Sequence, residues 1–376
     1  MNYDERFDAL RQNMDGKKID YIIILPGDNF RYMTGLKYDP LERLSFMMIG
    51  SGHSEVYFFV PKVEIARIET LSRLNIDFDV FMWNDEEGPE KELDTLKKVF
   101  GNRHVKIGVE FNRFTLAKKN RLKKLIQNAV LEDTTEVFYE LRLKKDKDEI
   151  RQFEIASEIS DKALKNVIDA VKTDITEREI SNRIKIELLK LGSESLPLEF
   201  KPIVAIGLNS AKPHTQSGEE MLKKGQTLLI DTGACWKGYA IDITRTFLIE
   251  PVDSEMKKIY QAVYEANKKA IESVRPEIEA DQIDRMARSV IEDAGYGEFF
   301  THRTGHGIGL EEHEPPWIVS GNTSRLEPGM TFTIEPGIYI PELGGIRIED
   351  NVLVTEEGYK VLTKYPKNLE SVLLEL

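Results

Sequence analysis

The sequence predicts a two-domain protein, with an α/β domain at the start of the chain and an α+β domain after it. Its 376 residues exceed the roughly 250 to 300 residues at which a single hydrophobic core usually stops growing. Short β-branched and aromatic runs alternate with polar stretches early in the chain, whereas long apolar stripes at helical spacing come later. We place the two domains at residues 1–133 and 134–376.

Continuous apolar runs predict buried strands in the first domain, because parallel strands that are covered on both faces lose the alternation of polar and apolar residues. These runs are 21–25, 46–49 and 56–60. Polar stretches around 64–74 and 90–99 are compatible with helices. The first domain therefore ends near Val130, and the boundary falls between about 131 and 144.

The second domain opens with a charged run at 144–149, after which apolar residues follow one helical face from Ile150 to Val171. A capping-box pattern at 176–179 predicts the start of another helix, and Gly192 is placed to end it. Two more helices are expected at about 254–274 and 281–294.

A degenerate repeat connects two distant parts of the second domain. Asp231 ends an apolar strand before a glycine turn, and Asp242 lies between isoleucines in a segment that we expect to return as a strand. Glu335 and Glu349 hold the same two positions in the segment 332–349. Because alternate side chains on a strand share a face, two such hairpins can direct four carboxylates to one point.

Four carboxylates among apolar residues repel one another unless a cation compensates their charge. Four of the six histidines lie between His214 and His313, among them His306 in a Gly-His-Gly segment. Oxygen ligands with one imidazole suit Mn, Fe, Co or Zn, and two such ions can share bridging carboxylates. We expect two divalent ions. Mn or Co is preferred, with Fe or Zn as alternatives, because the expected ligands are mostly carboxylates and no cysteine accompanies them.

The same residues allow other interpretations. Asp242 alone could pair with Arg245, Asp231 or Glu335 alone could serve a turn, and a lone His306 could be a structural hydrogen-bonding residue. Residues 229–234 resemble the active-site turn of an aspartic protease, but that chemistry needs a second aspartate turn, which is absent. Neither a Gly-x-Ser-x-Gly motif nor a histidine motif beside Cys235 supports a serine or cysteine hydrolase.

The charge and the composition of the chain limit the kinds of molecule that it can bind. A net charge of -13 and a pI near 5.2 disfavour nucleic-acid binding, which needs clustered Lys and Arg. The single cysteine fits a reducing compartment, and the sequence contains no apolar run of membrane-spanning length and no signal-like start. We expect a soluble, cytoplasmic protein that binds neither nucleic acid nor membrane.

Seven motifs, in order, resemble those of the creatinase, aminopeptidase P and prolidase branch of the pita-bread metallopeptidases. They are NSAKPH at 209–214, DTGA at 231–234, YAIDITRT at 239–246, HRTGHGIG at 302–309, HE at 313–314, EPGIY at 335–339 and RIED at 347–350. A weaker match is NFRYMTGL at 29–36. The resemblance implies a creatinase-type α/β domain followed by a pita-bread α+β catalytic domain, usually in a homodimer. The segment from Asp28 to Pro40 is the candidate contribution to the other subunit's site.

The resemblance also implies an Xaa-Pro dipeptidase (prolidase) that acts on small peptides, in which a hydroxide bridging two metals attacks the scissile carbonyl. The implied metal ligands are Asp231, Asp242, His306, Glu335 and Glu349. Glu335 would carry the proton to the leaving nitrogen and His313 would stabilise the oxyanion, with His214 as a third catalytic position. The implied substrate contacts are His214, His302, His313 and Arg347.

Several alternatives stay open within this branch. One is an aminopeptidase P-like enzyme for longer peptides, and another is a non-peptidase that acts on a small amide. A metal-free relative and a non-catalytic interaction module are disfavoured by the complete ligand set. The sequence departs from some prolidases at Pro315 to Trp317, where those enzymes place an arginine, so the group that holds the proline carboxylate is unassigned.

Overall fold

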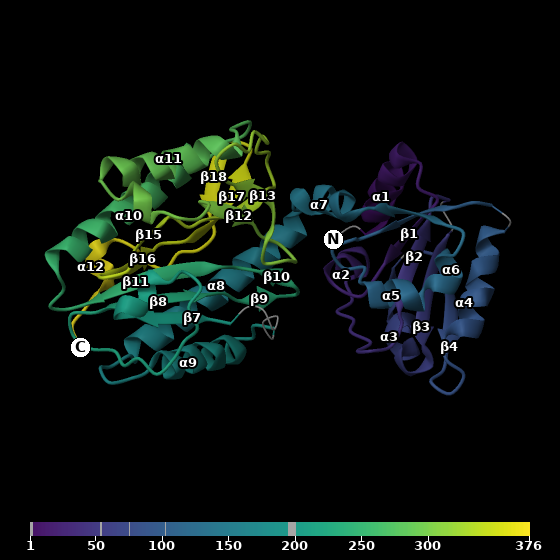
Figure 1. Ribbon diagram of the computed structural model, residues 1–376, viewed down its shortest axis with the longest axis horizontal. Helices are drawn as coiled ribbons and strands as arrows, with labels where there is room; N and C mark the ends of the chain where they lie inside the picture. Colours follow the sequence, from purple (N-terminus) through teal and green to yellow (C-terminus); the bar gives the residue numbers. More distant parts are fainter. Residues whose placement is uncertain (1–2, 53–54, 75, 102, 195–200) are drawn as a thin grey trace. The chain divides into compact units, whose positions relative to one another are not determined.

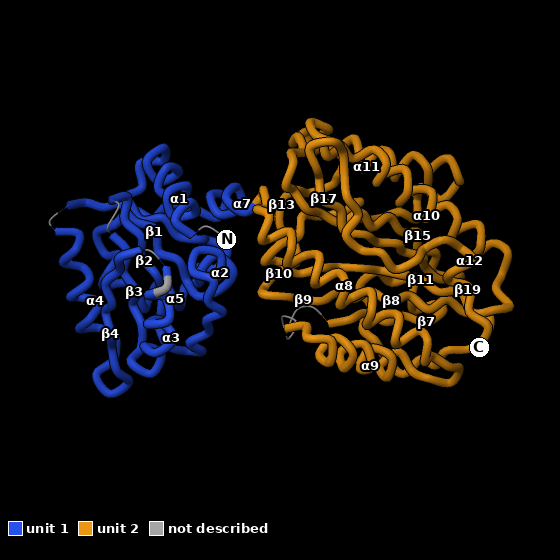
Figure 2. Tube along the Cα trace, turned by 180° about the vertical axis from the view of Figure 1, so that it is seen from behind, with its two compact units in different colours: residues 1–142 blue, residues 143–376 orange. Residues whose placement is uncertain are grey.

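The computed structural model describes residues 3–52, 55–74, 76–101, 103–194 and 201–376. The chain forms two compact units, Met1–Arg142 and Leu143–Leu376 (Figure 2). The sequence boundary between 133 and 134 lies just before helix α7 (Thr135–Leu143), whereas the structure assigns nearly all of this helix to the first unit.

The first unit contains a six-stranded sheet with the order β4-β3-β2-β1-β5-β6 (Figure 1). The three apolar runs form β1 (Tyr21–Ile24), β2 (Phe46–Gly50) and β3 (Val56–Pro61), as predicted. No strand was predicted at β4 (Asp79–Trp83), β5 (Lys106–Val109) or β6 (Val130–Asp133). Strands β4 and β6 are the two edges of the sheet and keep several side chains exposed. The apolar run from Val80 to Trp83 was a usable signal for β4, whereas β6 has only two apolar residues.

Helix α1 (Tyr3–Lys17) of the first unit has 15 residues, and the helices that follow it are shorter. They are α2 (Asp28–Thr34), α3 (Ile65–Glu69), α4 (Glu90–Lys97), α5 (Leu116–Arg121) and α6 (Lys123–Ile126). The helix expected around 64–74 consists of α3 between two 3-10 turns, Lys62–Glu64 and Thr70–Arg73. The segment expected as a loop from Asp28 to Pro40 begins as helix α2, which ends where Gly35 adopts a left-handed φ of 71°. Only its second half is irregular.

The second unit has four long helices, all predicted from the sequence. They are α8 (Lys147–Asp169), α9 (Glu177–Lys190), α10 (Ser254–Ser273) and α11 (Ala280–Asp293). Capping boxes start α8 at Asp146 and α9 at Thr176, so local hydrogen bonds to the first free N–H groups fix both helix starts. The fifth helix, α12 (Leu369–Val372), is a single turn.

Two sheets lie between these helices. The strand order is β19-β11-β8-β7 in the first sheet and β13-β12-β14-β17-β18 in the second. Figure 1 shows α8 and α9 on one side of the strands and α10 and α11 on the other. The strand bounds are β7 (Ile203–Ile206), β8 (Thr227–Thr232), β9 (Cys235–Trp236), β10 (Tyr239–Ala240), β11 (Ile243–Ile249), β12 (Gly305–Gly307), β13 (Glu314–Ile318), β14 (Thr331–Ile334), β15 (Gly337–Ile340), β16 (Gly344–Arg347), β17 (Asp350–Thr355), β18 (Gly358–Val361) and β19 (Leu373–Leu374).

The repeat found in the sequence has a more elaborate geometry than two simple hairpins. Strand β8 pairs antiparallel with β11, and β14 pairs antiparallel with β17. In each pair a small two-stranded hairpin is interposed, β9–β10 in the first and β15–β16 in the second. The second acid of each pair therefore does not lie within the returning strand, as expected, but directly before it: Asp242 precedes β11 and Glu349 precedes β17.

Among the described residues, no helix has both the length and the apolar character needed to cross a membrane.

Candidate metal centre

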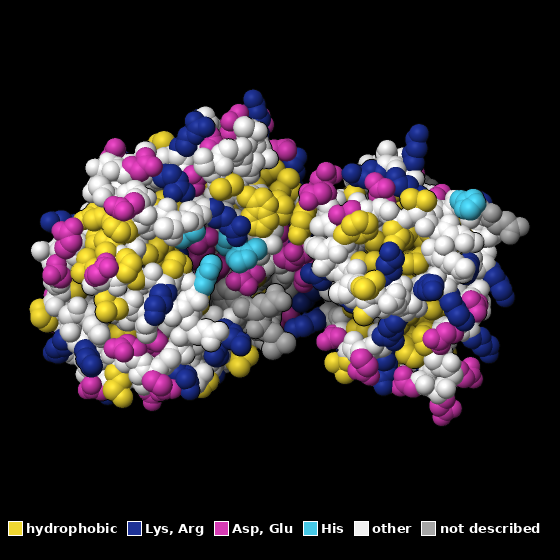
Figure 3. Space-filling view, viewed as in Figure 1, with side chains coloured by type: hydrophobic (Ala, Val, Ile, Leu, Met, Phe, Trp, Pro, Cys, Tyr) yellow, Lys and Arg dark blue, Asp and Glu magenta, His cyan; other side chains and the backbone are white. Residues whose placement is uncertain are grey.

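A cavity of about 430 Å³ opens in the second unit where the acid-bearing strands converge. Figure 3 shows a hollow with acidic side chains in its depth and histidine and basic side chains around its opening. Every predicted metal ligand and substrate contact lines this cavity: Asp231, Asp242, His306, Glu335, Glu349, His214, His302, His313 and Arg347. The fold thus gathers residues that are more than 130 positions apart in the chain, since His214 and Glu349 lie on the same cavity wall. The assignment of each residue to a metal or to substrate remains a prediction.

Three of these residues form a compact donor set. Ligand atoms of Asp242, His306 and Glu349 all lie within 4.8 Å of one another, and all three side chains are buried. Oδ1 of Asp242 and Oε1 of Glu349 have no hydrogen-bond partner in the described part of the chain. A buried carboxylate oxygen without a partner is costly. The set therefore fits a cation, which would bind these two oxygens.

The electrostatics of the cluster lead to the same conclusion. Burial, reinforced by the neighbouring carboxylates, raises the pKa of Asp242 and of Glu349 well above the usual range. Burial also raises the pKa of Glu335 to about 7. Acids held this close together without a cation resist ionisation, whereas a bound divalent ion favours their charged forms.

Asp231 differs from the other three acids because it already has a cationic partner. Nη2 of Arg347 lies 2.5 Å from Oδ2 of Asp231. Arg347 is itself buried and donates from Nε to Thr244 Oγ1 at 3.1 Å and from Nη1 to the Tyr339 hydroxyl at 3.0 Å. Thr244 in turn donates to Oε2 of Glu349 at 2.7 Å. One chain of hydrogen bonds therefore orients acids from both halves of the repeat.

His306 is positioned as a ligand by the short strand β12. Its Nδ1 lies 3.0 Å from the carbonyl oxygen of Gly307, and its Nε2 lies 3.4 Å from Oε1 of Glu335. When Nδ1–H donates to the carbonyl, Nε2 is left unprotonated and faces the acids. Burial, followed by the proximity of His313, lowers the pKa of His306, which favours this neutral form.

The glycines that flank His306 have a steric role. A Cβ atom on Gly305 would collide with the backbone of Thr333, and one on Gly307 would collide with the backbone of Pro315. Only glycine lets β12 lie this close between β13 and β14. The Gly-His-Gly segment is thus required by the packing that presents the imidazole.

The remaining histidines lie nearer the cavity opening. His214 and His313 are exposed, and the rings of His313 and His306 meet edge to face with centroids 4.1 Å apart. His302 is more enclosed, with Nε2 2.9 Å from the Tyr339 hydroxyl. Burial and then the charge of Arg347 lower the pKa of His302 to about 4, so its ring is neutral near pH 7.

The structure adds residues to which the sequence assigned no role. Thr244 and Tyr339 belong to motifs quoted above. Thr244 could have been predicted to face the site, because it lies two residues after Asp242 and alternate residues on an extended chain share a face. Asn267 gave no such signal. It lies within α10, and its Nδ2 donates to the carbonyl oxygens of Ile334 at 2.9 Å and Ile348 at 3.2 Å, the residues directly before Glu335 and Glu349. Arg303 and Glu312 also line the cavity.

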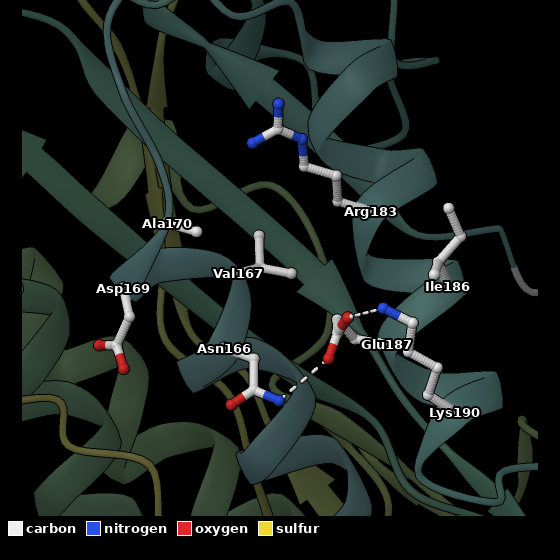
Figure 4. Close-up of a pocket in the computed structure, with 8 residues that line it drawn as sticks. All are labelled: Asn166, Val167, Asp169, Ala170, Arg183, Ile186, Glu187 and Lys190. Carbon is white, nitrogen blue, oxygen red and sulfur yellow. Dashed lines mark hydrogen bonds and ion pairs between the residues drawn. The ribbon is translucent and has the colours of Figure 1, made fainter.

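A second hollow, between α8 and α9, lacks this convergence (Figure 4). Its two carboxylates are both paired with lysines, since Glu187 accepts from Lys190 at 2.8 Å and Asp169 accepts from Lys165. Asn166 donates to the other oxygen of Glu187 at 3.0 Å. The groups are satisfied by surface ion pairs, so this hollow is not a candidate active site.

Comparison with known proteins places the site in a family. Residues 151–356 match the family described as Metallopeptidase family M24, and residues 6–144 match the Creatinase/Prolidase N-terminal domain. The solved structure of a prolidase from Thermococcus sibiricus has a TM-score of 0.91 and 34% identity, and the match covers 100% of both chains.

Two further comparisons agree. The Xaa-Pro dipeptidase from Bacillus anthracis has a TM-score of 0.88 and 32% identity, over 99% of this chain and 100% of that one. A curated relative from Staphylococcus haemolyticus, Uncharacterized peptidase SH1217, is 35% identical over 367 residues, which cover 96% of this chain and 99% of the relative. The predicted fold class, a creatinase-type domain followed by a pita-bread catalytic domain, is confirmed.

Proposed function

The chain belongs to metallopeptidase family M24, and from that premise we propose that it is an Xaa-Pro dipeptidase that works with two divalent metal ions. The observation that carries the proposal is the likeness to the Thermococcus sibiricus prolidase over the full length of both chains. The cluster of four acids and one imidazole in a single cavity supports the two-metal part.

We assign the metal ions to Asp231, Asp242, His306, Glu335 and Glu349. The free oxygens of Asp242 and Glu349, together with the unprotonated Nε2 of His306, supply donors at the centre of the cluster. Oxygen-rich sites with one imidazole suit Mn or Co, with Fe or Zn as the alternatives. When bound, the ions would polarise the scissile carbonyl and make a deprotonated water available near neutral pH.

Glu335 is the proposed proton carrier. Its carboxylate reaches into the cavity beside His306, and Thr333 Oγ1 lies 3.3 Å from its Oε1 and so orients it. In this role Glu335 accepts a proton from the attacking water and passes it to the nitrogen of the leaving proline.

His313 is the proposed donor to the tetrahedral oxyanion. It is exposed at the cavity opening and lies against His306, so an N–H on its ring can reach a carbonyl oxygen that is bound at the acids. His214 lines the same opening and is the second candidate donor. His302 is enclosed, and together with Tyr339 and Arg347 it forms a polar surface that can contact the substrate.

The proposed preference for proline has a chemical reason. The bond before proline is a tertiary amide without an N–H, so a peptidase cannot hold it through a hydrogen bond from that nitrogen. A site that positions the carbonyl through cations and histidines does not depend on the missing donor. The cavity offers both kinds of group.

The test compares peptides of different length with protein loaded with Mn or Co. Leu-Pro and Met-Pro should be cleaved with a higher kcat/KM than the same sequences extended by two residues. Faster cleavage of the extended peptides would replace the dipeptidase with an aminopeptidase P-like enzyme. Cleavage of no peptide bond, with turnover of small amides, would favour the non-peptidase alternative.

We further propose a homodimer in which the first unit of one subunit, through the segment from Asp28 to Pro40, contributes to the site of the other. Support comes only from the family's usual assembly, since a single chain is described. Sedimentation velocity should give twice the 43.2 kDa chain mass. A fully active monomer would refute the assembly.

A further inference from the structure

Arg303 has an unusual position for a charged side chain in an acidic cavity. Its guanidinium carbon lies 4.6 Å from the centroid of the Trp317 ring, which is a cation–π contact. Within the described chain, its guanidinium forms no ion pair and no hydrogen bond. A cation that lines the cavity and is held by an aromatic face keeps its N–H groups available to a ligand.

The register of strands β12 and β13 explains why Arg303 and Trp317 lie close together. In the antiparallel pair β12–β13, Trp317 lies directly opposite His306. Directly opposed side chains in a sheet share a face, so the indole stands on the same side as the proposed metal ligand. Arg303 comes three residues before His306 and lines the same cavity. The register thus places Arg303 and Trp317 beside the predicted metal site.

Arg303 and Arg347 both line the cavity that contains Glu335. The two are not equivalent, because Arg347 is already committed to Asp231, Thr244 and Tyr339.

We propose that Arg303, stacked on Trp317, binds the C-terminal carboxylate of the substrate and so restricts the enzyme to dipeptides. The proposal rests on the proposed function, because it names the carboxylate anchor of an Xaa-Pro dipeptidase. It also accounts for Trp317: this chain has no arginine at positions 315–317, and the indole instead contacts an arginine from the segment just before β12.

The chemistry favours arginine for this role. A guanidinium is always charged and presents a planar fork of N–H groups that matches a carboxylate in two parallel hydrogen bonds. Stacking on an indole fixes the plane of the fork without using its N–H donors. A peptide extended beyond proline has an amide at this point, which loses the charge and forces more chain into the cavity.

The experiment measures kcat/KM for Leu-Pro and for Leu-Pro-amide, which lacks the carboxylate charge. The variants are Arg303→Met, Arg303→Lys and Trp317→Leu, with Arg325→Met as the matched control. Arg325 is an exposed arginine of the same unit that pairs with Glu277. Metal content per chain is measured for every variant, so that a loss of metal is not mistaken for a loss of anchoring.

The expected result is a change in the ratio of kcat/KM for Leu-Pro to kcat/KM for Leu-Pro-amide. Arg303→Met should lower kcat/KM for Leu-Pro by about 10- to 100-fold more than it lowers kcat/KM for Leu-Pro-amide, mostly through KM. Arg303→Lys should recover part of the ratio, and Trp317→Leu should lower it by about 3-fold through loss of the stacking. The ratio cancels any effect of Arg303 on Glu335, because both substrates need the same proton transfer. An equal change for both substrates, or none for either, would overturn the anchor.

A binding measurement separates this inference from the proposed function. Calorimetry with L-proline and with prolinamide on the metal-loaded protein tests the anchor without hydrolysis. Tighter binding of proline that disappears in Arg303→Met upholds the anchor even if no Xaa-Pro bond is cleaved, and in that case only the proposed function fails. Dipeptide cleavage with an acid-to-amide preference independent of Arg303 leaves the proposed function intact and refutes the anchor.

Discussion

The buried Arg347 forms an ion pair with the partly buried Asp231, with Nη2 2.5 Å from Oδ2, at the edge of the acid cluster. The pair engages one oxygen of Asp231 and directs the carboxylate toward the cavity. Arg347 also supplies positive charge to a group of acids that repel one another. Its importance for stability should therefore depend on whether a metal is bound.

The first prediction concerns Arg347→Met. Removing one partner of a buried pair leaves an uncompensated charge, so the metal-free variant should lose about 3 to 5 kcal/mol of unfolding free energy. Loading with Mn should reduce the loss, because the ions replace the missing positive charge. Urea denaturation with and without chelator measures both values. The control is Arg325→Met, at an exposed ion pair, which should change the unfolding free energy little in either state. Equal losses for Arg347→Met with and without metal would show that bound ions do not replace the charge of Arg347.

The second prediction concerns Glu335→Gln, which keeps the side-chain shape but cannot carry a proton. We expect kcat to fall by about 100- to 10,000-fold if Glu335 is the proton carrier. Steady-state kinetics on protein of verified metal content provides the measurement. The control is Glu327→Gln, the same change at a half-exposed glutamate before strand β14. Near-wild-type turnover by metal-replete Glu335→Gln would remove Glu335 from the mechanism.

The third prediction is that metal binding releases protons, and that the release declines as pH rises through about 7. In the metal-free protein, burial raises the pKa of Glu335 to about 7, so at pH 6 this group is mostly protonated and must lose its proton to bind a cation. At pH 8.5 it is already ionised. The lowered pKa of His306 means that its imidazole is neutral throughout this range and adds no proton.

Titration calorimetry in buffers of different ionisation enthalpy counts these protons. The apparent metal affinity should increase with pH over the same interval, because protons and the metal compete for the same carboxylates. Glu335→Gln should release fewer protons at pH 6 than the wild type. A release that does not vary between pH 6 and pH 8.5 would contradict the raised pKa of Glu335.

The fourth prediction concerns Asn267→Asp. The Asn267 amide donates to the backbone directly before both Glu335 and Glu349, and a carboxylate cannot donate these two bonds. The spacing of the two acids should relax, and metal affinity should fall by about 10- to 100-fold, as is usual when a group supporting a ligand is lost. Gln261→Glu is the matched control, an amide-to-acid change at an exposed position of the same helix. Unchanged metal affinity in folded Asn267→Asp would show that helix α10 does not set this spacing.

The fifth prediction is that removal of metal abolishes activity. Dialysis against a strong chelator should reduce turnover to background, and Mn or Co should restore it. Elemental analysis should then find two ions per chain. Turnover that survives verified removal of the ions would exclude a metal-dependent mechanism.

The sequence by itself determined the features that depend on neighbours along the chain. Helices α8 and α9 begin where capping boxes at Asp146 and Thr176 satisfy the first backbone N–H groups, and these contacts span only three residues. The apolar strands β1, β2 and β3 were equally visible, because full burial leaves a continuous hydrophobic run. The order and spacing of the motifs likewise identified the family and the residues that line the cavity.

Only the tertiary structure decided how those residues act on one another. The edge strand β6, and the hairpins inserted between the paired strands, have no distinctive local pattern. The contact of Arg303 with Trp317 depends on the register of β12 and β13, and the reach of Asn267 to two strand ends depends on how α10 packs. Each joins groups through space, with a geometry set by the packing of whole elements, and local sequence patterns do not specify such distances.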